Sequence, residues 1–364
     1  MSNAIQNQYT PDYVSPPGET LEELLKKKGI TQAELAEQTG RSRQTINEII
    51  NGKTAITPET ALQLERVLGV PASFWNNRER DYQEALARQE EQERLSKQVA
   101  WLDQIPVKDM IKQKWIQSYQ DKVEQLREVL NFFGVASPNQ WQEFWGGMPV
   151  NFRKSPAFKS DPGAVAAWLR RGEIEAAEIG CATYNASKFK ETLQQVRALT
   201  IEPPEIFQFE VVRLCAAAGV AVVFVPELPK TRTSGATRWL NPNKALIQLS
   251  LRYKTNDYLW FAFFHEAGHI LLHGKRDVFL EVKGTQGDKE KEADTFAANL
   301  LIPPAELKQF LASGQQHSKA AIAQFASEIG IAPGIVVGRL QHDGVLLPSH
   351  CNDLKCRLEW VSDD

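Results

Sequence analysis

Cysteine is scarce in this chain of 364 residues, which has four, at positions 181, 215, 351 and 356. Their spacing matches neither the disulfide framework of a small secreted protein nor a zinc motif built from paired cysteines. Scattered cysteines of this kind are typical of a reducing compartment. We therefore expect a cytoplasmic protein.

Long apolar runs and an excess of one charge are also lacking. No stretch approaches the roughly 18 apolar residues of a membrane span, and the first residues do not have the charged and apolar regions of an export signal. The net charge of −3, from 42 basic and 45 acidic residues, gives no general affinity for polyanions. These features predict no membrane partner, and the length is sufficient for two or three hydrophobic cores.

Histidine is scarce too, with six in the chain, yet two of them lie four residues apart in His265-Glu266-Ala267-Gly268-His269. On a helix this spacing puts both imidazoles on one side, where they can bind one metal ion, and Glu266 beside them could take a proton from a bound water. Apolar residues on both sides of the motif predict a largely buried helix, in which unpaired imidazoles would be costly. The pattern predicts a zinc hydrolase centre.

A third protein ligand would leave the fourth zinc position for water. We favour Glu290, which opens the sequence Glu290-x-x-Ala293-Asp294. The small Ala293 would allow a second helix to approach closely, and Asp294 could accept the remaining N–H of a ligating histidine. Two alternatives stay open: His273, although it lies two helical turns beyond the first histidine, and Glu292.

These two segments closely resemble the ImmA/IrrE metallopeptidase family. The resemblance rests on the run from Phe263 to His273 and on the run from Glu290 to Pro303, and it extends over about residues 205–345. It implies zinc bound by His265, His269 and Glu290, with Glu266 as the catalytic carboxylate. Members of this family include proteases that cut a repressor protein after a stress or quorum signal.

A small sheet is expected before the helix that carries His265 and His269. Residues 219–226 form a β-rich run, and shorter strands are predicted at 236–240 and 245–249, with a turn at 241–243. We expect strand 245–249 to lie beside the site and to pair with an extended peptide substrate. No spacing selects a donor for the developing oxyanion, for which three residues are in sequence range: Arg238, Tyr253 and Tyr258.

The N-terminal region carries a second, separate pattern. Residues 31–40 read as a short capped helix that ends in a glycine turn, and residues 42–50 read as a second helix with isoleucines on one side. Polar side chains of the kind that contact phosphates and base edges lie on and next to the second helix, namely Arg41, Arg43, Gln44, Thr45, Asn47 and Lys53. This arrangement predicts DNA binding by a helix-turn-helix.

The stretch from Gly18 to Trp75 resembles the Xre-type helix-turn-helix, and most of all its HigA antitoxin branch. Residues 1–80 contain nine basic and ten acidic side chains, so any DNA contact depends on the local group Arg41, Arg43 and Lys53. A monomer with so few cations would bind weakly. We therefore expect a homodimer on a two-fold operator.

The sequence as a whole predicts a multi-domain, mainly α fold. We expect a disordered tail (1–17), an all-α helix-turn-helix bundle (18–80), a helical linker and middle region (81–204), a zincin-like α+β peptidase domain with a small sheet (205–304) and a C-terminal helical subdomain (305–364).

Three functions are compatible with these patterns. The first, which we favour, is a DNA-binding transcription regulator with a zinc peptidase domain that cuts a partner regulator or itself. The second is an antitoxin-like repressor that binds a toxin and its own operator, with an inactive peptidase domain. The third is a peptidase that uses its helix-turn-helix only to dock proteins. The protein partner is accordingly a repressor or a toxin.

Overall fold

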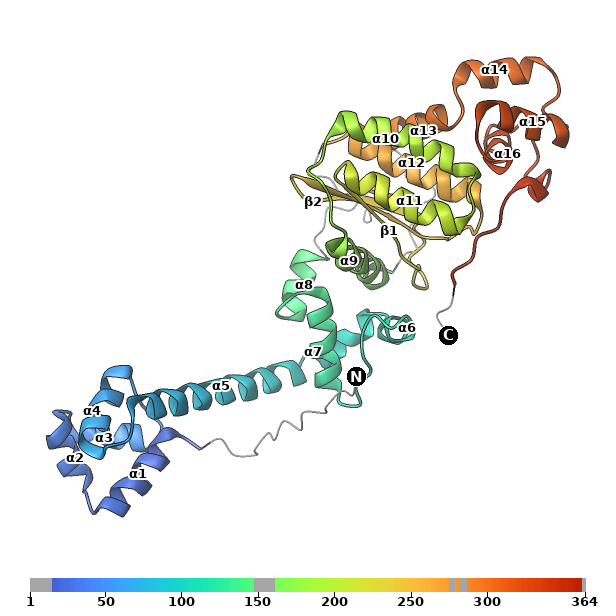
Figure 1. The fold of residues 1–364 in the computed structure, drawn as a ribbon. Coiled ribbons are helices and arrows are strands. Elements are labelled where there is room, and N and C mark those ends of the chain that lie inside the picture. Colours follow the sequence, from blue (N-terminus) through green and yellow to red (C-terminus); the bar gives the residue numbers. More distant parts are fainter. Residues whose placement is uncertain (1–14, 147–160, 275–278, 282–286, 362–364) are drawn as a thin grey trace. The chain divides into compact units, whose positions relative to one another are not determined.

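A computed structural model describes residues 15–146, 161–274, 279–281 and 287–361 of the chain. The chain divides into two compact units, Met1–Val99 and Ala100–Asp364, which are described separately (Figure 1). Most of the predicted tail, residues 1–14, lies outside the described residues.

The first unit consists of α-helices whose ends follow from local sequence. They are α1 (Pro17–Lys28), α2 (Gln32–Thr39), α3 (Arg43–Ile50), α4 (Pro58–Leu68) and α5 (Ala72–Ser96). Thr31, Ser42 and Thr57 cap α2, α3 and α4 with their side-chain oxygens. Glycines in the left-handed conformation end α1, α2 and α4.

The core of this unit lies between α1 to α4 and the start of α5. Leu21, Ile46, Leu64 and Trp75 are among its fully buried side chains. Beyond this core α5 is mostly polar, and Leu95 is its only other buried residue. The isoleucine face of α3 is therefore committed to packing, which leaves its polar face exposed.

The second unit begins with short helices joined by aromatic side chains. They are η1 (Val99–Gln104), α6 (Val107–Lys112), α7 (Lys122–Phe133) and α8 (Pro138–Phe144). Trp101, Phe133 and Trp141 meet edge to face, with ring centroids 5.4–6.5 Å apart. The Arg170 Nε–H donates to the Phe132 carbonyl oxygen at 2.8 Å, which attaches these helices to α9 (Pro162–Glu178).

A four-stranded sheet forms the centre of the second unit. Its strands are β1 (Val220–Phe224), β2 (Gly235–Asn241), β3 (Lys244–Leu249) and β4 (Phe279–Glu281), in the order β1-β3-β2-β4. β3 runs parallel to β1 and antiparallel to β2, which also pairs with β4 in antiparallel fashion. The three longer strands lie where the sequence predicted strands, whereas β4 was not predicted.

Helices cover both faces of this sheet. α9 packs on one face, and α11 (Pro204–Ala217) and α12 (Asn256–Leu272) pack on the other, with α10 (Ala186–Ala198) outside them and η3 (Leu199–Ile201) after it (Figure 1). Neighbouring residues of β2 face opposite helices: the Thr237 hydroxyl donates to the Glu266 carbonyl of α12, and Arg238 donates to the Leu169 carbonyl of α9. Helix α12, which carries His265, Glu266 and His269, is thus hydrogen-bonded to β2 of the sheet.

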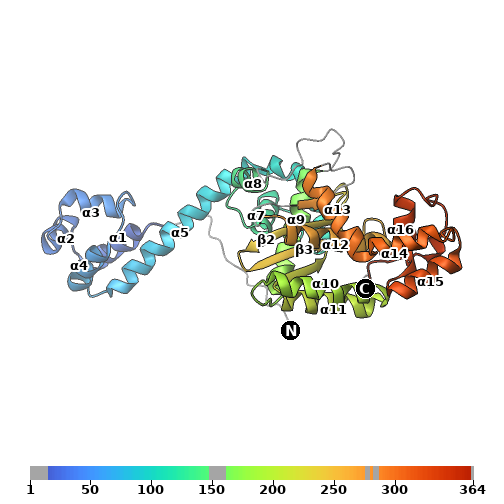
Figure 2. The same cartoon turned by 90° about the horizontal axis from the view of Figure 1, so that it is seen from above.

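The remaining helices follow α12 in the sequence. α13 (Asp288–Leu301) packs along α12, and α14 (Pro304–Ala312), α15 (Lys319–Ile329) and α16 (Pro333–His342) gather at one end of the unit, before η4 (Asn352–Leu354) (Figure 2). Lys355 forms a buried ion pair of 2.7 Å with Asp257, which ties the C-terminal segment to the start of α12. The predicted mainly α fold with a small α+β unit is confirmed.

Among the described residues, no single helix has the length and apolar character needed to cross a membrane. In the described part of the chain, α15 and α16 reach that length and apolar character only as a pair, and the chain bends by 113° between them.

Candidate functional site

The first candidate site lies on α12, a helix that is buried along most of its length. Trp260, Phe263 and Phe264, which precede His265 by one to five residues, anchor it in the main core of the unit. His265, Glu266 and His269 are each at most 2 % exposed. Their polar side chains therefore depend on partners inside the protein.

Three donor atoms converge at this point. The Nε2 atoms of His265 and His269 are 3.0 Å apart, and the Glu290 Oε2 atom lies 3.2 Å from the first and 3.6 Å from the second. Two ligands about 2 Å from a tetrahedral zinc ion are separated by about 3.3 Å. Two imidazoles and one carboxylate at these separations fit a zinc ion with an open position, so the residues present suit the metal that the sequence predicted.

The charges at this point favour metal binding as well. Burial on its own would raise the pKa of the Glu290 carboxyl, but hydrogen bonds from His265 and His269 outweigh it and lower that pKa to about 2. Burial also lowers the pKa of His269, so its imidazole is favoured in the neutral form that ligates a metal.

The other nitrogen of each candidate ligand has its own partner. His265 Nδ1 lies 2.9 Å from Asp294 Oδ1. His269 Nδ1 lies 2.9 Å from His273 Nδ1, and His273 Nε2 lies 3.0 Å from Glu292 Oε2. The structure thus brings Glu290 to the donor cluster, whereas Glu292 and His273 lie in an outer layer behind His269.

The Glu266 side chain is enclosed between α12 and β2, and it is fully buried. A Cβ atom built on Gly235 of β2 would lie 2.8 Å from Glu266 Oε1. Only glycine at position 235 leaves room for this carboxylate where it stands. The carboxylate thus has a defined place one residue from His265, on the helix that carries both histidines.

The second candidate site is the exposed side of α3 in the first unit. Gln44 and Asn47 are exposed on it and bonded within the helix, Gln44 to Glu48 at 2.9 Å and Asn47 to Asn51 at 3.1 Å, while the partly buried Thr45 lies 2.8 Å from the Ser42 hydroxyl.

The three basic residues predicted to contact DNA differ in their surroundings. Arg43 and Lys53 are exposed, whereas Arg41 donates to Gln63 Oε1 at 2.7 Å and lies 3.5 Å from Glu59. This exposed acidic side chain would compete with a phosphate for the Arg41 guanidinium.

Comparison with known proteins gives one family match over each of the two regions that contain a candidate site. The pattern of a helix-turn-helix family matches residues 21–75, and the pattern of a peptidase family described as an IrrE N-terminal-like domain matches residues 217–341. The chain joins a helix-turn-helix domain to an IrrE-like domain. The first match contains α2 and α3, and the second contains α12 and α13.

Individual relatives match the helix-turn-helix domain. The chain is 40 % identical over 77 residues to virulence-associated protein I of Dichelobacter nodosus, a match that covers 21 % of this chain and 71 % of that protein. One similar solved structure is the antitoxin HigA of Pseudomonas aeruginosa with the higBA promoter, which is 33 % identical over 21 % of this chain and 83 % of that one, with a TM-score of 0.20. Another is an addiction module antidote protein of a HigA family from Coxiella burnetii, which is 29 % identical over 23 % of this chain and 92 % of that one, with a TM-score of 0.22.

One expectation about the IrrE-like domain was wrong, and one of the three residues in range as oxyanion donors is excluded. Strand β3 does not offer an edge to a peptide, because β1 and β2 pair with its two sides. Arg238 faces α9 on the side of the sheet away from α12, where it forms a buried ion pair of 2.7 Å with Glu173. Its place on the opposite face removes it as a donor to an oxyanion at the metal centre.

The two tyrosines considered as oxyanion donors lie near the start of α12. Their rings stack on each other with centroids 4.2 Å apart, and Lys355 lies over the ring of Tyr258. Tyr258 precedes His265 by seven residues, which is about 10 Å along a helix. This distance places the pair away from the donor cluster.

Three features of the IrrE-like domain were not predicted from the sequence. They are the contact of Gly235 with Glu266, the hydrogen-bonded link from His269 through His273 to Glu292, and the stacking of Phe279 on His269. The Phe279 ring stacks on the His269 imidazole, with centroids 3.9 Å apart and planes 15° apart. The i, i+4 spacing of His269 and His273 was the available signal for the link, because side chains at that spacing meet on a helix. Nothing in the local sequence indicated the other two.

Proposed function

We propose that this protein is a transcription regulator that binds an operator as a homodimer, and that its IrrE-like domain is a zinc-dependent endopeptidase. The peptidase would hydrolyse a bond in a partner regulator or in the protein itself. The observation that carries the proposal is the convergence of His265 Nε2, His269 Nε2 and Glu290 Oε2, on the helix that carries Glu266 and on the helix packed along it.

The proposed ligands are His265, His269 and Glu290, with Asp294 holding the first of them in orientation. A zinc ion held by these residues would act as a Lewis acid, polarising a peptide carbonyl and lowering the pKa of a water molecule toward 7. Glu266 accepts the proton of the attacking water and then delivers it to the departing amine.

The enclosure of Glu266 supports this role. A fully buried carboxylate between α12 and β2 is fixed in position by packing, and it is shielded from the solvent that would otherwise weaken its interaction with a proton. In this proposal α12 supplies two zinc ligands and α13 supplies the third. Glu266, which lies between the two histidines in the sequence, supplies the base.

The polar face of α3 supports the role in transcription. Arg43, Gln44 and Asn47 project from the second helix of the helix-turn-helix, the helix that enters the major groove in proteins of this kind. We propose that these residues, together with Thr45, read base edges or phosphates, while Arg41 and Lys53 contact phosphates.

Incubation of the purified protein with the proteins encoded beside its gene tests the peptidase proposal. Discrete fragments of a neighbour, or of the protein itself, are expected with zinc and not after treatment with a chelator. Glu266→Gln is the matched control, because it keeps the three proposed ligands and removes the base, so it should bind zinc but yield no fragments. Fragments from the Gln variant at the wild-type rate would contradict the role of Glu266.

A further inference from the structure

The two candidate zinc ligands of α12 are supported in different ways. A carboxylate, that of Asp294, lies directly behind His265 at 2.9 Å. Behind His269 lies another imidazole, that of His273, and only behind this one does a carboxylate follow, that of Glu292. We propose that His273 is a positioning residue for His269 and that Glu292 fixes the orientation of His273. This inference rests on the proposed zinc centre.

With a metal ion bound at Nε2 of His269, the hydrogen bonds behind this residue allow one consistent arrangement of protons. His269 Nε2 faces His265 and Glu290, so it must present a lone pair there in order to ligate a metal. A neutral imidazole with a lone pair on Nε2 carries its proton on Nδ1. That proton is donated to His273 Nδ1, and His273 then carries its own proton on Nε2, which donates to the Glu292 carboxylate.

The end of α12 puts His273 in this position. The helix stops at Leu272, and His273 is its C-cap, with extended backbone and its N–H still bonded to the His269 carbonyl at 3.1 Å. The His273 side chain is only 3 % exposed, and its ring lies 5.3 Å from that of Phe279, which stacks on His269. Packing therefore fixes both imidazoles against one aromatic ring.

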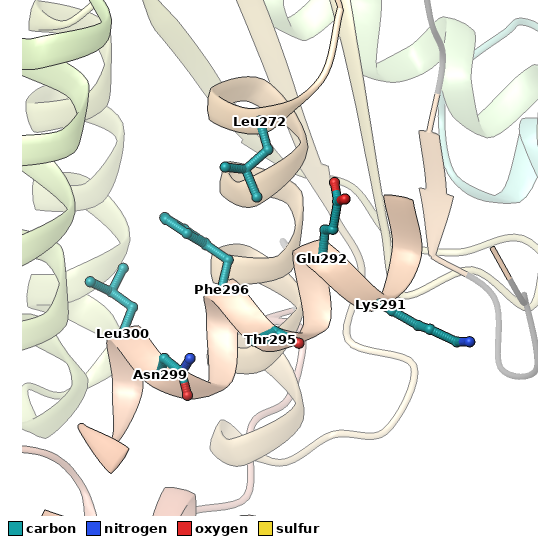
Figure 3. Close-up of a pocket in the computed structure, with 7 residues that line it drawn as sticks. All are labelled: Leu272, Lys291, Glu292, Thr295, Phe296, Asn299 and Leu300. Carbon is teal, nitrogen blue, oxygen red and sulfur yellow. The ribbon is translucent and has the colours of Figure 1, made fainter. Parts of the chain in front are cut away.

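The outer end of this link lies at the surface. The Glu292 side chain is 60 % exposed, and it forms part of the wall of a groove of about 600 Å³ along α13 (Figure 3). In that view Glu292 projects toward the end of α12, where Leu272 lies, whereas Lys291 projects away from it. A change at Glu292 should therefore alter His269 without altering the core.

The test compares zinc affinities in the full-length protein by competition with a chromophoric chelator. Loss of a group behind a ligating histidine weakens metal binding by about 10- to 100-fold, which is the loss expected for His273→Leu. In His273→Asn the amide oxygen stands close to the position of Nδ1 and can accept the His269 proton, so most of the affinity should return. Glu292→Gln, on the surface, should show a smaller loss and no change in folding.

Controls separate this inference from the zinc centre itself. His317→Leu and Glu306→Gln remove exposed groups elsewhere in the unit and should leave the affinity unchanged. Wild-type protein that binds no zinc would overturn the proposed function, and this inference with it. Wild-type protein that binds zinc while His273→Leu binds equally well would overturn this inference alone. The inference would also be overturned if His273→Asn bound zinc as weakly as His273→Leu. That result would indicate that His273 ligates zinc directly, because an asparagine amide can keep the hydrogen bond to His269 but cannot replace an imidazole ligand.

The visible spectrum of the cobalt-loaded protein gives a second readout. In His273→Leu the His269 ring is no longer held in orientation, so the absorption bands of the bound cobalt should change. In His273→Asn the hydrogen bond to His269 is kept, so the bands should stay close to those of the wild type. Identical spectra for all three proteins would contradict a positioning role.

Discussion

Substitution of Gly235 by alanine adds one methyl group against the Glu266 side chain of the proposed centre. The new Cβ atom would lie 2.8 Å from Glu266 Oε1 and 2.9 Å from Glu266 Cγ. Non-bonded carbon contacts settle at about 3.5–4.0 Å, so the Glu266 side chain must move by at least about 0.6 Å. β2 cannot retreat easily, because β3 and β4 pair with its two sides.

Two effects of known size follow from this displacement. Forcing a methyl group into a packed core costs about 1–3 kcal/mol of stability. A misplacement of about 1 Å in a catalytic group can reduce the rate about 100-fold, so a loss of about 10- to 100-fold is expected for the smaller shift. Zinc affinity should change little, because the contact involves Glu266 and none of the three proposed ligands.

Urea unfolding followed by tryptophan fluorescence measures the first effect, and fragment release measures the second. Eight of the nine tryptophans lie in the second unit, so the signal reports mainly on that unit. Gly180→Ala is the matched control, because a Cβ atom there has nothing within 4 Å. Wild-type stability and wild-type cleavage in Gly235→Ala would refute the placement of the Glu266 carboxylate against β2.

Two further predictions concern acid and salt. The Glu290 pKa, lowered from 4.5 to about 2 in the folded metal-free protein, contributes about 3 kcal/mol of stability above pH 4.5, and this is lost as the pH falls from 4.5 toward 2. Glu290→Gln should therefore flatten that part of the stability profile, and an unchanged profile would contradict the hydrogen bonding of Glu290 to the two histidines. For DNA, three phosphate contacts on each subunit of a dimer predict a slope of about −5 for the logarithm of affinity against that of salt concentration. Arg43→Ala should reduce its magnitude by about 2, whereas a flat wild-type response would rule out operator binding through these cations.

Local spacing predicted the parts of the centre that lie within single helices. The offset between His265 and His269 is fixed by helical geometry, so their shared side could be read from the sequence. The same holds for Glu290 and Asp294, which are one turn apart on α13. The approach of the two helices followed from residue size, because a Cβ atom on Gly268 would lie 3.3 Å from the Ala293 Cα atom.

Relations between strands could not be read in the same way. Alternation divides Gly235, Thr237 and Arg238 between two faces of β2, but it does not tell which face receives α12. The central place of β3 results from strand order, which local sequence does not contain. Strand β4 has three residues, too few for a periodic pattern, although it brings Phe279 onto His269.

The two hydrophobic cores described above have no residue in common within the described parts of the chain. Each half can therefore vary, or be exchanged for a relative, without rebuilding the other. In a cell, alleles damaged in opposite halves would be expected to complement each other wherever cleavage in trans suffices. Such genetics would show whether the proposed operator recognition and the proposed proteolysis can be lost independently of each other.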